Sequence, residues 1–233
     1  MEVAFSRTAT VLAVLIAGAM FIPQAHAELI VNGSFEAPAL GANKNYFQLL
    51  NAGSNALPGW TIGGKSIDVL GVGNPYVSGT PADGQQYVDL VGSPGPGTLS
   101  QTFSTVAGQQ YELSFAYAHN YNGLNGSENP ISQALVELLG GATLLSESLS
   151  HSDSVAGDLK WIIATYIFTA DSNSTTLRFS SQGVGSSGYA GLLLDNVSVT
   201  ALTTPEPASL AVWSLLGAAG LAYRWRRKRT SVA

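Results

Sequence analysis

The residue types of a serine hydrolase stand side by side in this chain, at His151, Ser152 and Asp153. A catalytic triad needs three side chains that converge in space, so three adjacent residues of one loop do not form one. His119 follows a strand-like segment, which predicts a place at the rim of a sheet. The sequence has no Gly-x-Ser-x-Gly elbow and no His-Glu-x-x-His motif. With no cysteine there is also no thiol nucleophile. We therefore predict that the protein is not an enzyme.

Acidic residues dominate the middle of the chain. Between Glu28 and Thr204 there are four Lys and Arg residues against thirteen Asp and Glu residues, a formal charge of −9. Such a surface repels phosphate backbones, which excludes nucleic acid as a partner, and it favours cations. Two facing carboxylates can hydrolyse glycosides. No acid lies in a recognisable catalytic context, so a carbohydrate-active hydrolase remains the least favoured alternative.

Loop tyrosines offer a different chemistry, the binding of sugars. Pyranose rings pack their C–H faces on aromatic planes, and their hydroxyls need amide or carboxylate partners. The candidate ligand-binding residues have Gly-, Asn- and Ser-rich surroundings: Tyr46, Tyr76, Asn120, Tyr121, Asn122 and Tyr189. The alternative for each of them is ordinary loop packing. Trp60 and Trp161 are predicted to be core residues.

Residues 28–204 are predicted to form one all-β domain. Short alternating or β-branched runs recur between Gly, Pro, Asn, Asp and Ser, without a convincing amphipathic helix. One face of Tyr111–Tyr117 is apolar because side chains alternate with period two. Lys160–Thr169 is apolar on both faces, which predicts a place in the middle of a sheet. The other predicted strands are Gln86–Val91, Thr98–Phe103, Ala134–Leu139, Thr143–Leu149, Thr175–Ser180 and Leu192–Thr200.

Residues 1–27 have the pattern of a secretory signal peptide. Arg7 supplies a positive charge, and an uncharged apolar run follows from Thr10 to Ile22. Ala25 and Ala27 form the small-x-small cleavage pattern, which predicts a mature start at Glu28. The alternative is a retained membrane anchor, but the apolar run is short for a spanning helix.

The C-terminal segment, residues 205–233, has three parts. Pro205, Glu206 and Pro207 come first, an uncharged and mostly apolar run covers residues 208–223, and a basic tail covers residues 224–229. The run predicts a short transmembrane helix, with its basic end on the cytoplasmic side. The alternative is a buried core helix with a basic tail, which five cations in six residues oppose.

This tripartite tail resembles a PEP-CTERM sorting signal. The resemblance rests on Pro205–Glu206–Pro207, the apolar helix and the basic cluster with Arg224, Arg226 and Arg227. It implies a Gram-negative host, an exosortase as the processing partner, and a membrane intermediate anchored by the helix. It also implies cleavage near the Pro-Glu-Pro motif and delivery to the cell surface or extracellular matrix. It says nothing of what the cargo does.

The body resembles the galactose-binding-like jelly rolls of carbohydrate-binding modules and of choice-of-anchor surface proteins. The shared motifs occur in this order: Asn32-Gly33-Ser34-Phe35-Glu36, Pro58-Gly59-Trp60, Asp83-Gly84, Tyr87-Val88-Asp89-Leu90, Gln101-Thr102-Phe103, Tyr111–Phe115 and Leu194–Val199. The resemblance implies a jelly-roll β-sandwich whose first and last strands are neighbours. It also implies a structural calcium ion shared by Glu36 and Asp195, since calcium prefers oxygen ligands. The alternative is that both acids are solvated or bind backbone in turns.

These observations predict an exported, non-enzymatic β-sandwich that binds or organises exopolysaccharide. The principal alternative is a purely structural surface protein without sugar affinity.

Overall fold

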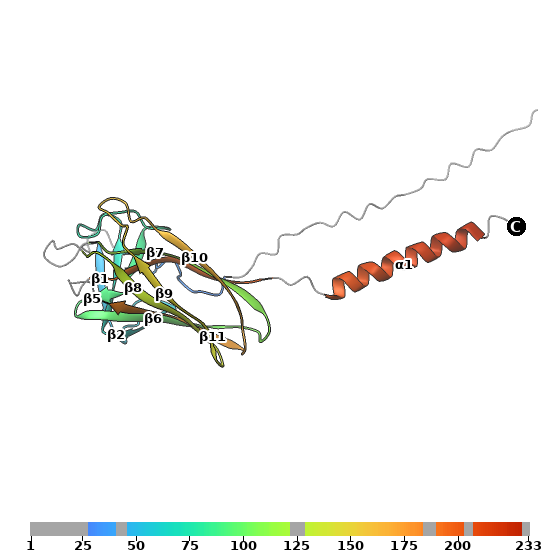
Figure 1. Ribbon diagram of the computed structural model, residues 1–233, viewed down its shortest axis with the longest axis horizontal. Coiled ribbons are helices and arrows are strands. Elements are labelled where there is room, and N and C mark those ends of the chain that lie inside the picture. The colour runs from blue at the N-terminus through green and yellow to red at the C-terminus, as the bar shows by residue number, and fades with distance from the viewer. Residues whose placement is uncertain (1–27, 41–45, 122–128, 184–189, 203–206, 230–233) are drawn as a thin grey trace, which may run out of the picture.

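The computed structural model describes residues 28–40, 46–121, 129–183, 190–202 and 207–229. The described part of residues 28–202 is a β-sandwich of two antiparallel sheets (Figure 1). Several predicted features lie outside the described residues: the signal peptide with Ala25 and Ala27, Asn122, Tyr189, Pro205 and Glu206.

In the described residues, six strands form the first sheet. Their spatial order is β1 (Phe47–Asn51), β3 (Ser66–Gly71), β4 (Gln86–Asp89), β12 (Leu192–Ala201), β7 (Gln110–His119) and β10 (Ile162–Thr169). The second sheet has the order β2 (Thr61–Gly64), β6 (Gly95–Ser104), β11 (Ser174–Gly183), β8 (Ser132–Leu139) and β9 (Thr143–His151). The short β5 (Val91–Gly92) pairs with β6.

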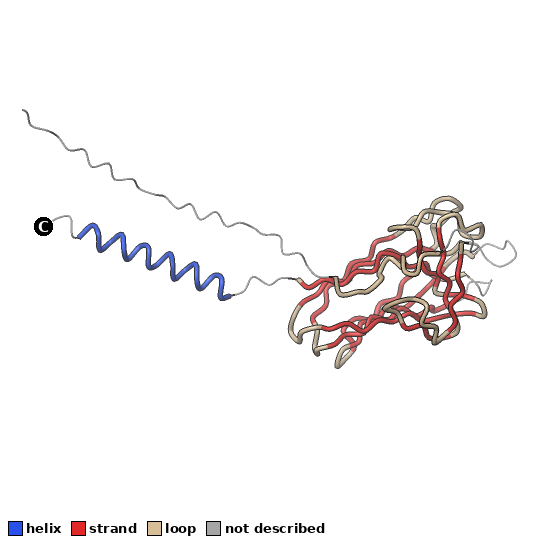
Figure 2. The backbone as a smooth tube through the Cα atoms, turned by 180° about the vertical axis from the view of Figure 1, so that it is seen from behind, coloured by secondary structure: helices blue, strands red, loops and turns tan. Residues whose placement is uncertain are grey.

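The strand order is that of a jelly roll. From β4 onward, the main strands pass from sheet to sheet so that β4, β12, β7 and β10 face β6, β11, β8 and β9. Eight strands in two sheets with this interleaving are two Greek keys, the jelly-roll arrangement. Figure 2 shows the two layers of strands from the opposite side. The predicted all-β sandwich is therefore confirmed.

The core lies between the sheets and follows the alternation in the sequence. In β7, Tyr111, Leu113 and Phe115 are all buried, as the period-two pattern predicts. Phe115 meets Phe179 of β11 across the sandwich, with ring centroids 5.0 Å apart in an edge-to-face geometry. Trp60 is buried in this core, as predicted, and its ring lies 5.5 Å from that of Phe35.

The predicted position of the Lys160–Thr169 segment is wrong. Its strand, β10, lies at the edge of the first sheet and pairs only with β7 among the described strands. Ile163 and Ile167 are 59% and 61% exposed, because they point to the outer surface of the sheet. Apolar residues on both sides of a strand do not by themselves set its place in a sheet. β1, β2 and β3 were not predicted, since they are short and rich in Gly or interrupted by polar residues.

The opening segment of the body runs beside its closing strand. The Leu29 amide donates to the Val199 carbonyl at 3.0 Å, and the Val197 amide donates to the Gly33 carbonyl at 2.9 Å. A β-carbon at Gly33 would lie 1.9 Å from the Val197 carbonyl oxygen, so only glycine allows this approach. The predicted neighbourhood of the two chain ends is confirmed, although residues 28–33 are not a regular strand.

A single helix, α1 (Pro207–Arg229), is found in the described residues. The predicted helix is thus present, but it is not confirmed as a membrane span: no described helix is both long and apolar enough to cross a bilayer. Its uncharged run ends at Arg224, and sixteen helical residues extend only about 24 Å. The buried-helix alternative is wrong, because Trp213, Leu216 and Leu221 are exposed.

Candidate ligand-binding face

The loop of residues 72–85, between β3 and β4, contains or contacts most of the predicted site residues. It covers the outer surface of the first sheet at the end where His119 of β7 pairs with Leu192 of β12. Its Val77 is buried in a second hydrophobic cluster, the outer cluster, whose buried members are Leu70, Val77, Tyr87, Ala118, Leu159 and Leu193. The Tyr87 hydroxyl donates to the Val77 carbonyl at 3.1 Å and fixes the loop to the sheet.

Two of the predicted tyrosines meet around Asn74 in this loop. The Asn74 side-chain amide donates to the Tyr46 carbonyl at 3.1 Å, and its Oδ1 accepts from the Tyr76 amide at 2.8 Å. The Tyr76 ring packs edge-on against Phe47, with centroids 6.4 Å apart. Tyr46 is 47% exposed and Tyr76 is 61% exposed, whereas Asn74 is buried. We call the surface that bears these two rings the tyrosine face.

Tyr121 holds the 72–85 loop, whereas Asn120 binds a buried acid of the sheet. The Tyr121 hydroxyl accepts from the Ser78 amide at 2.9 Å and lies 2.7 Å from the Ser78 hydroxyl, so it anchors the loop. Asn120 is buried, and its side-chain amide donates to Asp89 Oδ2 at 2.8 Å. Of the six predicted ligand-binding residues, Tyr46 and Tyr76 therefore present exposed rings, while Asn120 and Tyr121 hold backbone and side chains in place.

Two acids of the β3–β4 pair, the buried Asp89 and the half-buried Asp68, were not predicted as site residues. Asp68 and Asp89 lie opposite each other in the β3–β4 pair. Asp89 accepts from Asn120 and from the Val91 amide at 2.8 Å, whereas Asp68 Oδ1 is buried without a hydrogen-bond partner. Burial raises the pKa of each carboxyl to about 7. The signal in the sequence was an acid inside each of two otherwise apolar runs.

The acids predicted to share calcium each bind the backbone of the same loop. Glu36 Oε1 accepts from the Gln85 and Gln86 amides at 2.6 and 2.7 Å. Asp195 Oδ2 accepts from the Asp83 amide at 2.9 Å. Burial raises the pKa of Asp195 to about 7, although the backbone amides that bind it, chiefly that of Asp83, act against the rise.

These donor sets do not fit a calcium site. The three contacts place N–H groups, not further oxygens, on the carboxylates, and calcium needs six to eight oxygen ligands. Across the residues that the structure describes, no three His, Asp or Glu side chains group around a common point. The arrangement is that of the second alternative, in which Glu36 and Asp195 bind backbone in turns, and we therefore expect no calcium ion at this pair.

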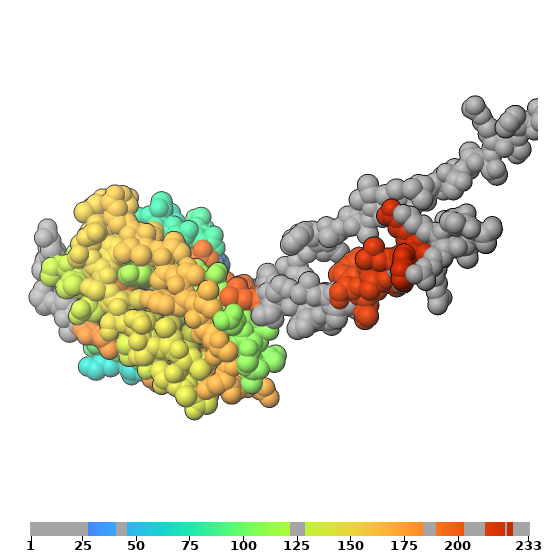
Figure 3. Space-filling view, turned by 45° about the vertical axis from the view of Figure 1, so that its right-hand side comes forward, coloured from blue at the N-terminus to red at the C-terminus, as the bar shows by residue number. Residues whose placement is uncertain are grey.

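A second loop, residues 152–161 between β9 and β10, packs against the first. The Gly157 amide donates to the Ser78 carbonyl at 3.2 Å, and Trp161 Nε1 donates to the Thr80 carbonyl at 2.8 Å. The Trp161 ring meets Tyr87 of the outer cluster, 5.8 Å away. In Figure 3 the two loops lie side by side in turquoise and gold at one end of the body.

The His151-Ser152-Asp153 sequence does not form a triad in the fold. The Ser152 hydroxyl donates to Asp153 Oδ1 at 3.1 Å, and the His151 ring instead points to His119 and to the Lys160 backbone. A second motif-like stretch, Gly59 to Ser66, fits the Gly-x-x-x-x-Gly-Lys-Ser pattern of phosphate-binding loops. It forms β2 and the turn into β3, without the following helix whose N-terminus such a loop needs.

These observations define the class of protein: a jelly-roll β-sandwich that presents exposed aromatic rings on a loop-covered end of one sheet. Residues 28–200 match the model of the family described as Protein of unknown function (DUF642). The chain belongs to this family.

Other proteins resemble the chain over part of its length or more distantly. Halomucin of Haloquadratum walsbyi (strain DSM 16790 / HBSQ001) is 34% identical over 199 residues, which cover 83% of this chain. The matched region spans only 2% of halomucin.

Among solved structures, TmCBM61 in complex with β-1,4-galactotriose matches with a TM-score of 0.46 and 12% identity, over 76% of this chain and 99% of that one. A family 35 carbohydrate-binding module from Clostridium thermocellum matches with a TM-score of 0.38 and 17% identity, over 66% and 96%. Because these likenesses are distant, we base the function on this chain's own residues.

Proposed function

We propose that this protein binds neutral glycan chains at the tyrosine face and catalyses no reaction. The observation that carries the proposal is the pair of exposed residues Tyr46, just before β1, and Tyr76, in the 72–85 loop, which Asn74 joins through their backbones. Aromatic planes held in place before binding lose little entropy when a sugar ring packs on them. The formal charge of −9 between residues 28 and 204 disfavours acidic polysaccharides.

The rigidity of the platform distinguishes it from an ordinary exposed loop. Asn74 connects both tyrosines through their backbones, and Tyr87, Tyr121 and Trp161 each bind the loop from a different element. The two backbone positions that carry the rings are thus held relative to each other. Several weak contacts along one polysaccharide chain would raise the overall affinity, because the first contact increases the effective concentration for the next.

The test is affinity electrophoresis of the full chain in gels that contain a neutral polysaccharide, with xylan, β-1,4-galactan, β-glucan and dextran in turn. One stacking contact is worth about 1 kcal/mol, so Tyr76→Ala should weaken binding by roughly five- to tenfold. Tyr223→Ala, at an equally exposed tyrosine of α1, is the matched control and should change nothing. The absence of retardation by all four polysaccharides, and by the host's own polysaccharide in a fifth gel, would favour the purely structural alternative. Release of reducing sugar would favour a hydrolase.

The proposed location is the cell surface or extracellular matrix of a Gram-negative bacterium, reached through an exosortase after a membrane stage. The support is the resemblance of Pro205–Glu206–Pro207 and the basic cluster to a PEP-CTERM signal. Mass spectrometry of the mature protein tests the route. We expect an N-terminus at Glu28 and a C-terminus close to residues 205–207; a tail intact to Ala233 would contradict exosortase processing.

A further inference from the structure

One edge strand of the described sandwich lacks the features that usually protect the edge of a sheet. β10 closes the first sheet and pairs only with β7 among the described strands. The other three edges are protected, because β1 and β2 are only five and four residues long and β9 carries the exposed Glu147. β10 is eight residues long and contains no charge, no proline and no glycine. Such an edge is a surface on which another strand can pair.

The free backbone groups of β10 belong to its odd-numbered residues. The Ala170 amide, just after the strand, donates to the Gln109 carbonyl at 3.0 Å, and the register with β7 continues from there without a shift. Alternate residues of an antiparallel pair turn their backbone groups to the partner strand, and here these are the even-numbered ones. Ile163, Thr165 and Ile167 therefore turn their N–H and C=O groups away from β7, and no other described residue binds them.

The side chains of the same three residues form an exposed and mostly apolar row. Ile163 and Ile167 are 59% and 61% exposed, and Thr165 between them is exposed as well. On β7, the small residues Ala116 and Ser114 lie opposite Ile163 and Thr165. In Figure 3 the gold and orange atoms of the segment that contains β10 lie on the surface that faces the viewer. A strand that pairs with this edge would gain hydrogen bonds and apolar contacts together.

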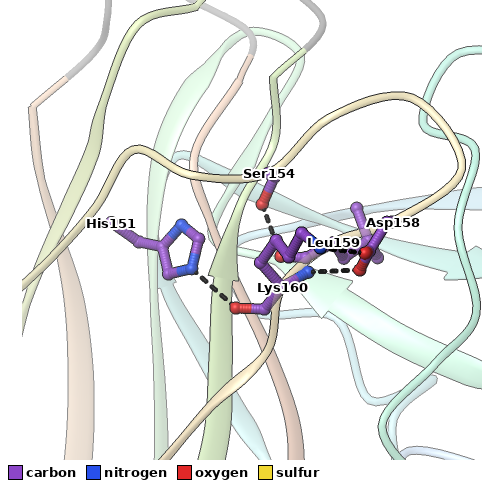
Figure 4. A network of polar contacts seen from close by, with 5 residues as sticks. All are labelled: His151, Ser154, Asp158, Leu159 and Lys160. Carbon is purple, nitrogen blue, oxygen red and sulfur yellow. Dashed lines mark hydrogen bonds and ion pairs between the residues drawn. The ribbon is translucent and has the colours of Figure 1, made fainter.

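β10 begins at a loop that is closed on itself. The Ser154 hydroxyl donates to the Leu159 carbonyl at 2.6 Å, and His151 Nε2 donates to the Lys160 carbonyl at 2.8 Å (Figure 4). The second bond joins the start of β10 to the end of β9, so the edge strand is fixed to both sheets. A strand that is already ordered loses little further freedom when another strand pairs with it.

The charges around β10 favour a second copy of this chain in antiparallel orientation. The formal charge of −9 between residues 28 and 204 makes two copies repel each other wherever their acids meet, but β10 itself is uncharged. The first charges beyond its ends have opposite signs: Lys160, which also pairs with Asp158, precedes the strand, and Asp171 follows it. Antiparallel pairing brings Lys160 of each copy to the end where the other copy has Asp171. Parallel pairing would bring like charges together.

The sequence of the strand selects one register. Because the free groups belong to odd-numbered residues, hydrogen bonds form only where odd-numbered residues lie opposite each other. With Thr165 opposite itself, Ile163 of each copy lies opposite Ile167 of the other. β-Branched apolar pairs of this kind stabilise neighbouring strands. Sliding one copy by two residues in either direction would place Ile163 opposite a threonine, Thr165 or Thr169.

We propose that two copies of this chain pair through β10, antiparallel and with Thr165 opposite Thr165, so that their two six-stranded sheets become one continuous sheet. Each copy uses the same strand, so the contact occupies both free edges and assembly stops at the dimer. The pairing does not depend on the proposed function.

Disulfide formation at position 165 tests this contact. The chain has no cysteine, so Thr165→Cys introduces a single thiol. Residues opposite each other in such a pair have Cα atoms about 5.5 Å apart, which a disulfide can span. In Thr169→Cys, the control on the same strand, the two Cα atoms would lie about 27 Å apart, eight residues along the strand.

The full chains are oxidised with oxidised glutathione in lauryldimethylamine oxide, a detergent that covers the apolar residues of α1, and are separated on non-reducing gels. We expect about tenfold more disulfide-linked dimer for Thr165→Cys than for Thr169→Cys, because only the first pair lies within bridging distance. Equal yields from the two variants, or no dimer at position 165, would overturn the proposal.

A charge on the edge should separate the copies. Ile163→Lys, added to the Thr165→Cys chain, places an ammonium group opposite Ile167 of the other copy and should abolish most of the disulfide dimer. Val31→Lys is the matched control, since Val31 is 57% exposed and lies beside Gln101 of β6, away from β10. Undiminished dimer in the Ile163→Lys chain, or an equal loss in both, would overturn the proposal.

Sedimentation equilibrium of the wild-type chain in the same detergent needs no variant. We expect a reversible change from monomer to dimer as the protein concentration rises, and no larger species. A chain that stays monomeric at every concentration, or that assembles beyond the dimer, would overturn the pairing.

Discussion

Acidification from pH 8 to pH 6 should stabilise this protein, because two buried carboxyls and one that is largely buried take up protons in the folded state. The pKa values of Asp68, Asp89 and Asp195 are all raised to about 7, against 3.8 for the ordinary carboxyl, chiefly by burial. Between these values the folded chain holds protons that the unfolded chain has lost. Stability therefore falls as the pH rises through this window and increases as the pH is lowered.

The magnitude follows from the same values. For one carboxyl with a folded pKa of about 7, the change from pH 8 to pH 6 adds about 1.4 kcal/mol to the free energy of unfolding. Three such groups add about 4 kcal/mol. His119 opposes this by about 0.8 kcal/mol, because its lowered pKa leaves it neutral while the unfolded chain takes up a proton near pH 6.5. The expected net gain is about 3 kcal/mol.

Urea unfolding at pH 6, 7 and 8 and constant ionic strength, followed by circular dichroism, measures this slope. Asp195→Asn should reduce the increase in the free energy of unfolding between pH 8 and pH 6 by about 1.4 kcal/mol. This holds whether the variant is more or less stable than the wild type at any single pH. Asp171→Asn is the control, since Asp171 is an exposed acid whose pKa is lowered by the Gly141 amide. Its slope should match that of the wild type. Stability that is constant, or that falls from pH 8 to pH 6, would refute the assignment of neutral buried carboxyls.

Three further changes test other parts of the structure. Gly33→Ala should lower the free energy of unfolding by several kcal/mol, because the added β-carbon meets the Val197 carbonyl. Gly217→Ala in α1 is the control, since a β-carbon there meets no atom within 4 Å. Equal melting temperatures of the two variants would contradict the close approach. Gln101→Ala should lower the free energy of unfolding by about 2 kcal/mol, since the side-chain amide binds both the amide and the carbonyl of Val31, and a loss below about 0.5 kcal/mol in urea unfolding would count against this role. A calcium chelator should leave the melting temperature unchanged, because N–H donors bind Glu36 and Asp195; a calcium-dependent rise would restore the predicted metal site.

The sequence predicted the fold where alternation and turn residues agreed. Tyr111–Tyr117 and Leu192–Thr200 became β7 and β12, and Gly140–Gly141 connects β8 to β9 as a hairpin. The place of β10 could not be predicted in the same way, because a strand's pattern records which of its side chains are apolar and not which strands lie beside it. The outer cluster could not be predicted either, because its apolar residues lie on a sheet face that also carries Asp68 and Asp89.

The candidate site was predictable by residue type and not by arrangement. Tyr46 and Tyr76 were found from their loop surroundings, but the role of Asn74, which joins them, depends on contacts across 28 residues of chain. His119 and His151 are 32 positions apart and meet only because two strands from different sheets end together. Long-range contacts of this kind leave no local pattern in the sequence.

The antiparallel approach of the opening segment to β12 determines how the domain resists mechanical tension. Residues 28 and 202 leave the sandwich at the same end, and the two loops with the tyrosine face lie at the other (Figure 1). A force applied between residues 28 and 202 would reach the Leu29–Val199 hydrogen bond first and the Val197–Gly33 bond only afterwards. Bonds that break one after another unzip at low force. If the domain is held by residue 202 alone, no force acts on residue 28, and neither hydrogen bond is loaded.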